Sequence, residues 1–169
     1  MRVISQTRVA LTLAALLAAT ALGIAFAAEH LGAVVPCALC LLERWPYRIV
    51  IALCLVGVPL PKPAARFILL LVALVLVGSA TMAGHHIGVE TGWWPGPLPE
   101  CAAPRLMDGT IAERLANMPL RPAKPCDEPT YLVPGLPVSI AGMNLMFSLL
   151  FIFGVATAFW RTRQHRINA

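Results

Sequence analysis

Two cysteines three positions apart begin the second apolar stretch of this chain, in the run Cys37-Ala-Leu-Cys40. Pairs with this spacing are typical of dithiols that form a disulfide and exchange it with other thiols. The disulfide of such a pair would close a very small ring and would constrain little of the unfolded chain, so a stabilising role explains it poorly. The spacing therefore favours redox chemistry.

Two charged residues, Glu43 and Arg44, follow the pair directly. If Pro36 starts a helix, Cys37 lies in the first turn, where unpaired N–H groups and the helix dipole favour a thiolate. Cys37, Cys40 and Arg44 then share one helix face. We expect the Arg44 guanidinium to stabilise a Cys40 thiolate and to offer donors to an anionic or carbonyl-bearing ligand. Glu43 either orients Arg44 or takes part in proton transfer.

The composition places these residues in a membrane protein. Hydrophobic residues make up 59% of the 169 residues and charged residues 12%, which is far too apolar for a soluble domain. Four stretches reach the roughly 20 residues that a helix needs to cross a bilayer. They cover residues 9–28, 37–60, 67–87 and 138–160. The sequence therefore predicts an all-α, four-helix transmembrane bundle in a single domain over residues 1–169, with one long loop at about 88–137.

Charged residues orient the predicted helices. All eight acidic residues fall on one side of the membrane, whereas the flanks on the other side carry only basic residues: Arg2, Arg8, Lys62, Arg66, Arg161, Arg163 and Arg166. By the positive-inside rule both termini are cytoplasmic. The net charge of +5 therefore reflects topology and gives no support to nucleic-acid binding. The run Ala25-Phe26-Ala27 resembles a signal-peptidase site, but the preceding apolar stretch is longer than usual for a signal, so we expect a retained helix.

This topology puts four of the five cysteines on the external side, and leaves Cys54 in mid-membrane as a small buried hydrophobe. An even set of external cysteines implies disulfides, and four cysteines allow three pairings. Cys101 and Cys126, taken alone, fit a stabilising disulfide in the long loop. A zinc site is a further alternative, but its ligands usually come as two CxxC pairs. We rank redox exchange first, structural disulfides second and metal binding third.

His85 and His86 end the third predicted helix on the external side, level with the cysteines. Either could pass a proton or a hydrogen bond to a reduced cofactor, or lie there as an interfacial polar residue. The sequence has no haem, flavin or nicotinamide motif, so a lipid-soluble carrier is the natural electron acceptor. In the long loop, four apolar residues recur at helical spacing: Met107, Ile111, Leu115 and Met118. They predict a short amphipathic helix that lies on the membrane surface or packs on the rest of the loop.

The string Pro36-Cys37-x-x-Cys40-x-x-Glu43-Arg44 at the start of the second helix resembles the DsbB family of bacterial inner-membrane disulfide-forming proteins. With the loop cysteines, the resemblance covers nearly the whole chain. It implies a multi-pass protein of the inner membrane with its redox cysteines on the periplasmic side. The implied activity is that of a quinone-dependent protein-disulfide oxidoreductase, which oxidises a dithiol protein and reduces ubiquinone or menaquinone.

The resemblance also implies a role for each cysteine. Cys101 would form the mixed disulfide with a DsbA-like periplasmic protein of the thioredoxin fold, and Cys126 would be its pairing cysteine. Cys37 would exchange with the loop cysteines, and Cys40 would face the quinone.

The same resemblance makes Arg44 a quinone-binding residue, with Glu43, His85 and His86 as further candidates. The family's histidine near the quinone aligns with His85, with His86 or with neither, because the stretch from residue 85 to 94 departs from the better-known members.

Two other classes of function stay open. One is a thiol relay that runs in the reverse direction or resembles vitamin K epoxide reductase, although that family carries its CxxC on a different helix. The other is a non-enzymatic membrane module, either a disulfide-stapled scaffold or a metal binder. The position of CxxC at the start of the second helix favours the oxidoreductase.

Overall fold

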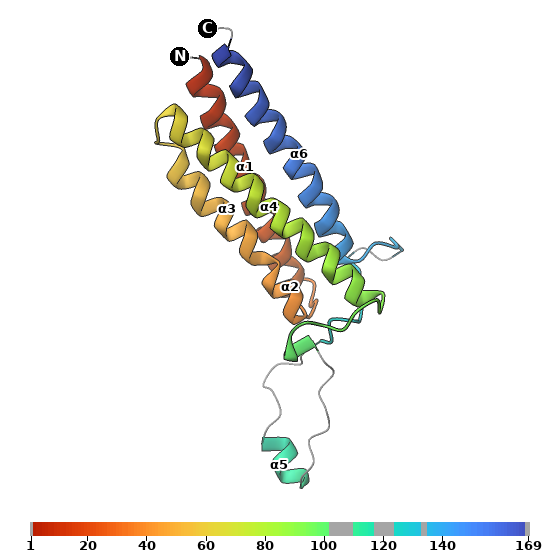
Figure 1. The fold of residues 1–169 in the computed structure, drawn as a ribbon. Helices are drawn as coiled ribbons and strands as arrows, with labels where there is room; N and C mark the ends of the chain where they lie inside the picture. The colour runs from red at the N-terminus through yellow and green to blue at the C-terminus, as the bar shows by residue number, and fades with distance from the viewer. Residues whose placement is uncertain (1, 102–109, 117–123, 133–134, 168–169) are drawn as a thin grey trace.

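The computed structural model describes residues 2–101, 110–116, 124–132 and 135–167, and these residues are all-helical with no strand (Figure 1). Figure 1 shows long helices packed side by side, with both termini at the same end of the bundle. The elements are α1 Arg2–His30, α2 Ala38–Leu42, α3 Arg44–Gly57, α4 Lys62–Glu90, the 3-10 turn η1 Pro99–Cys101, α5 Ile111–Ala116 and α6 Ile140–Ile167. The predicted all-α fold is confirmed, and α2 with α3 forms the second of four segments.

Three helices of the described chain are long and apolar enough to cross a membrane: Gln6–His30, Lys62–Glu90 and Ile140–Thr162. The second expected helix, over 37–60, is not continuous, because α2 ends at Leu42 and α3 starts at Arg44. The cause is Pro46, which has no N–H to give to the Leu42 carbonyl and whose ring would clash with it. Pro46 instead occupies the first turn of α3, where its missing N–H costs nothing. Glu43 lies at the break.

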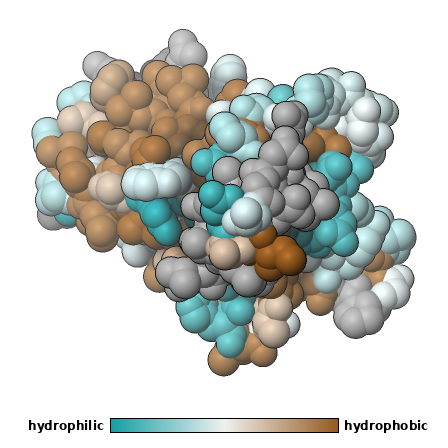
Figure 2. All heavy atoms as spheres, turned by 90° about the horizontal axis from the view of Figure 1, so that it is seen from below, coloured by the Kyte–Doolittle hydropathy of each residue, from teal (hydrophilic) through white to brown (hydrophobic). Residues whose placement is uncertain are grey.

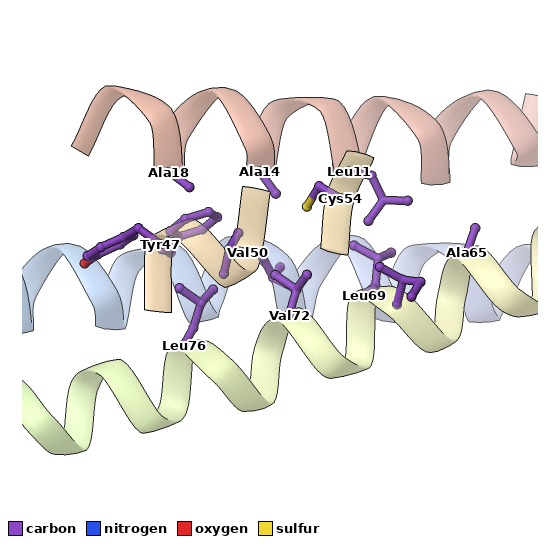
Figure 3. Close-up of a cluster of buried hydrophobic side chains, with 13 residues drawn as sticks. Leu11, Ala14, Ala18, Tyr47, Val50, Cys54, Ala65, Leu69, Val72 and Leu76 are labelled. Carbon is purple, nitrogen blue, oxygen red and sulfur yellow. The ribbon is translucent and has the colours of Figure 1, made fainter. Parts of the chain in front are cut away.

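Small side chains let the helices approach closely in the core (Figure 3). In hydrocarbon, helices associate through such packing because lipid tails are as apolar as the side chains. Ala14 and Ala18 of α1 are buried against α3, and Cys54 lies in the same cluster with no exposed surface, as a small hydrophobe. The larger side chains of this cluster include Leu11, Tyr47, Val50, Leu69, Val72, Leu76 and Phe151.

The outward faces of the long helices carry exposed apolar side chains, such as Leu16 on α1, Leu74 on α4 and Phe153 on α6. Seen from the loop end, hydrophobic surface lies beside a hydrophilic area (Figure 2). Scattered apolar exposure of this extent fits helices that contact lipid.

The amphipathic helix expected in the long loop is present as α5, which covers Ile111 and Leu115; Met107 and Met118 lie outside the described residues. Thr110 caps it, because its Oγ1 accepts from the Glu113 backbone N–H at 3.4 Å while its own backbone N–H donates to Glu113 Oε2 at 2.8 Å. This is a capping box. The backbone N–H of Thr110, and then its hydroxyl, hold the pKa of Glu113 below its usual range.

Close contact between α3 and its neighbours depends on Gly57. A Cβ at this position would lie 2.9 Å from Ile68 Cγ2 and 3.0 Å from Leu11 Cδ1. We therefore expect Gly57→Leu to destabilise the bundle by about 1–3 kcal/mol through overpacking. Thermal unfolding in detergent measures this. Gly78→Leu is the control, because Gly78 on α4 is exposed and a Cβ there meets nothing within 4 Å. Equal melting temperatures for the two variants would contradict the packing argument.

Candidate redox site

Cys37 caps the N-terminus of α2. Its backbone is extended, with ψ 171°, and its sulfur accepts a hydrogen bond from the Cys40 N–H at 3.2 Å. The sequence placed Cys37 inside the first turn, but it lies one position earlier and takes the role that a serine or aspartate usually has. The consequence is the one expected from a first-turn position, because a helix N–H pointing at the sulfur stabilises negative charge on it.

The two thiols of the CxxC pair are in contact. Both are free, and the Cys37 S–H donates to Cys40 Sγ at a sulfur–sulfur distance of 3.0 Å. A disulfide bond measures about 2.0 Å, so a shift of about 1 Å would join them. Cys37 is buried, whereas Cys40 is partly exposed and lines a cavity. The two sulfurs thus have different surroundings.

His86 of α4 completes a cysteine–histidine–carboxylate arrangement. Its Nε2 lies 3.5 Å from Cys37 Sγ, and its Nδ1 lies 2.8 Å from Glu43 Oε1. His86 is 1% exposed and Glu43 5%. When Nδ1–H donates to the carboxylate, Nε2 is left to accept the Cys37 proton, which is the geometry by which a base activates a thiol.

His85, the other candidate histidine, lies away from the cysteines. Its ring is exposed and packs on Trp94 with ring centroids 5.4 Å apart, and its carbonyl accepts from Trp94 Nε1 at 2.8 Å. Trp94 fits there because of Gly88, where a Cβ would lie 2.1 Å from the indole ring. The structure thus brings His86 and not His85 to the cysteines, and neither lines the cavity beside Cys40.

A chain of polar side chains runs from Glu43 into the bundle. Glu43 Oε2 accepts from Asn144 Nδ2 at 2.8 Å, and the Tyr47 hydroxyl donates to Asn144 Oδ1. Ser148 Oγ lies 3.0 Å from the Tyr47 hydroxyl and 3.2 Å from Ser79 Oγ. Glu43 lies at the break between α2 and α3, and the other residues come from α3, α4 and α6. Polar groups buried in a bundle are costly unless they hydrogen-bond to one another. This network of hydrogen-bonded side chains therefore fixes the relative positions of these helices.

Arg44 does not contact Cys40 or Glu43 in the way the sequence suggested. Its guanidinium pairs with Glu29 Oε2 of α1 at 2.7 Å and lies 5.0 Å from the centre of the Phe26 ring. Glu43 is engaged by His86 and Asn144 instead. Glu29, which the sequence did not single out, is therefore the residue that positions Arg44.

A cavity of about 260 Å³ lies between α1, α3 and α6. Its walls are mostly apolar, with a few polar groups that converge at one end, an arrangement typical of small-molecule sites. The apolar walls include Leu17, Ala21, Ile24, Val35 and Phe147, and the polar groups include Cys40, Glu43, Arg44, Tyr47 and Asn144. The cavity can take an apolar ring that carries hydrogen-bond acceptors, with the Cys40 sulfur at its wall.

The loop cysteines form a disulfide, Cys101–Cys126, which lies beside Cys37. Both are buried in one cluster with Cys37, Leu39 and Val89. The Cys126 N–H donates to the Cys101 carbonyl at 3.2 Å, and Lys124 pairs with Cys37 in an isolated parallel β-bridge. Of the pairings that the sequence left open, the structure shows this one, with Cys37 and Cys40 as an adjacent dithiol.

Residues 7–159 match the family model described as "Disulfide bond formation protein DsbB". The chain is also 26% identical over 137 residues to the "Uncharacterized protein RP370" of Rickettsia prowazekii (strain Madrid E), which covers 80% of this chain and 78% of that protein. No solved structure matches the chain. Because the family model spans most of the chain, the resemblance to the DsbB family is confirmed, and the protein is a member of this family of membrane proteins that form disulfide bonds.

Proposed function

We propose that this protein is a protein-dithiol:quinone oxidoreductase of the bacterial inner membrane. It reoxidises a DsbA-like periplasmic protein of the thioredoxin fold and passes the electrons to ubiquinone or menaquinone. One observation carries the proposal: the Cys101–Cys126 disulfide lies beside Cys37, Cys37 contacts Cys40 at 3.0 Å, and Cys40 lines the apolar cavity. The four sulfurs are thus arranged in series between the loop and the cavity.

Electron transfer starts at the loop disulfide. A thiolate of the reduced partner attacks Cys101, forming a mixed disulfide and releasing Cys126 as a thiol. The second partner thiol then displaces Cys101, so the partner leaves oxidised and the loop holds a dithiol. That dithiol exchanges with the Cys37–Cys40 disulfide, which restores Cys101–Cys126 and leaves Cys37 and Cys40 reduced. The structure has this last combination of a loop disulfide and a CxxC dithiol.

Closing the cycle requires Cys37 and Cys40 to lose two electrons and two protons. A quinone held in the cavity would accept both. The residues fit such a group, because the walls are apolar and Arg44, Tyr47 and Asn144 bring polar groups to the end where Cys40 lies. Arg44 has further N–H donors, besides the one given to Glu29, that can bind a carbonyl oxygen.

His86, held by Glu43, exchanges a proton with Cys37. His86 Nε2, at 3.5 Å, can give a proton to Cys37 Sγ when the loop dithiol displaces it, and can accept that proton again when the Cys37–Cys40 pair is reoxidised. Glu43 holds Nδ1 and so fixes the tautomer that leaves Nε2 available. Glu43 also lines the cavity, so it lies between His86 and the site proposed for the quinone.

An electron sink is required on energetic grounds. A partner such as DsbA has a reduction potential of about −120 mV, whereas an ordinary dithiol such as that of thioredoxin lies near about −270 mV. The difference of about 150 mV corresponds to about 7 kcal/mol for two electrons, so an ordinary disulfide could not reoxidise the partner unaided. Coupling to membrane quinone removes this obstacle.

Quinone reduction by the purified protein tests the proposal. With a reduced DsbA-like partner and a soluble quinone analogue, we expect quinone absorbance to fall in step with oxidation of the partner's thiols. Cys40→Ala should abolish turnover, because the sulfur at the cavity is lost, and Cys54→Ala should keep it, because Cys54 lies in the core away from the site. A scaffold or a metal-binding module would give no quinone reduction with any partner or with either quinone class.

The pair between Arg44 and Glu29 generates a second prediction. We expect Glu29→Gln to raise the KM for quinone about tenfold, equivalent to about 1.4 kcal/mol, with little change in the KM for the partner protein, because Arg44 loses the carboxylate that positions it. Steady-state kinetics with each substrate varied in turn measures this split. Glu90→Gln is the matched control, since Glu90 accepts from Ser139 and does not line the cavity. An unchanged quinone KM in Glu29→Gln would show that the pair has no part in binding.

A further inference from the structure

The reduced pair and His86 also present a compact set of metal donors. The sulfurs of Cys37 and Cys40 and a ring nitrogen of His86 all lie within 4.8 Å of one another. Two thiolates and an imidazole are the donors that zinc prefers. We propose that the reduced site binds one thiophilic divalent ion, and that Zn²⁺ is the ion whose chemistry the donors fit.

The distances agree with one shared ion. Zinc lies about 2.3 Å from sulfur and about 2.0 Å from nitrogen, so tetrahedral ligand atoms are about 3.5–3.8 Å apart. Cys37 Sγ and His86 Nε2 are already 3.5 Å apart. The two sulfurs, at 3.0 Å, must separate by about 0.7 Å, which rotation of the partly exposed Cys40 side chain supplies.

The surroundings hold the histidine in the orientation a metal needs. Metal-binding histidines usually give their other ring N–H to a carboxylate, which fixes the tautomer and makes the ligand more basic. Here His86 Nδ1 lies 2.8 Å from Glu43 Oε1, and Asn144 holds the second oxygen of Glu43 at 2.8 Å. The nitrogen that faces Cys37 is therefore Nε2, and three helical segments fix its position.

Charge and redox chemistry restrict binding to one state of the protein. Zn²⁺ with two thiolates is neutral, so the buried site gains no uncompensated charge. Binding releases two thiol protons to solvent and moves no electron, because zinc has no redox chemistry. The Cys37–Cys40 disulfide has no thiolate to offer, so the oxidised protein lacks two of the three ligands. A bound ion would hold the pair reduced and prevent disulfide formation.

Three protein ligands leave the fourth zinc position for water, which is typical of exchangeable sites rather than structural ones. Cys40 is partly exposed, so its sulfur can be reached by an ion. Zinc bound at this site would inhibit oxidation of the dithiol. This inhibition is a property separate from the redox activity of the same residues.

Zinc binding by purified protein, without quinone or partner, tests this inference separately from the proposed function. Cys101 and Cys126 are both replaced by serine, so that only the CxxC pair changes oxidation state. Under anaerobic conditions, competition with a chromophoric chelator measures affinity, and Cd²⁺ reports thiolate ligation by its ultraviolet charge-transfer absorption. We expect one ion per reduced chain, with thiolate absorption, and at least about 100-fold weaker binding after oxidation.

Neighbouring histidines provide a matched pair of variants. His86→Ala should weaken zinc binding by at least about 100-fold, and Glu43→Gln by about 10–100-fold, whereas His85→Ala should leave it unchanged. Equal binding by the reduced and oxidised protein would overturn the proposal, and so would equal losses in His85→Ala and His86→Ala. The comparison of oxidation states leaves all three ligands, Cys37, Cys40 and His86, unsubstituted, so it decides the matter even if His86→Ala does not fold.

Discussion

The hydrogen bond between His86 and Glu43 is the interaction on which the rest of the site depends. It joins α4 to the break between α2 and α3, with both partners almost fully buried. Losing one member of such a buried pair typically costs about 3–5 kcal/mol, because the other is left uncompensated. Pro46 creates the break and so frees Glu43 to face two ways, toward His86 on one side and toward Asn144 on the other.

This arrangement separates the surroundings of two sulfurs that are in contact. Cys37 has a backbone donor, a histidine and the loop disulfide around it, which suits a thiol that exchanges with other thiols. Cys40 lies at the wall of an apolar cavity with Arg44 and Asn144, which suits a thiol that gives electrons to a lipid-soluble acceptor. A single CxxC pair can thereby join chemistry in the loop to chemistry in the membrane. The same closeness of sulfur and imidazole makes the reduced pair a good metal ligand.

Much of the architecture could be predicted from the sequence, because apolar length and charge placement determine spans in a bilayer. The choice of His86 over His85 was also within reach. One face of α4 is buried, and its residues follow helical spacing: Leu69, Val72, Leu76, Ser79 and Ala83. His86 continues this spacing, whereas His85 does not. The break at Glu43 could also have been predicted, because Pro46 interrupts a helix at this point. The pairing of Arg44 with Glu29 had none, because it depends on how α1 packs against α3.

Mapping disulfides in the Cys40→Ala variant tests the central claim, that Cys37 is the junction between the loop disulfide and the cavity. Without Cys40, the Cys37 thiol can react only with the loop. When the variant is incubated without partner or reductant, the Cys37 thiolate should attack the loop disulfide, and non-reducing peptide mass spectrometry should find Cys37 joined to Cys101 or Cys126 with the other loop cysteine released as a thiol. A free Cys37 beside an intact Cys101–Cys126 disulfide, at the pH and in the detergent in which the wild-type protein turns over, would contradict the account.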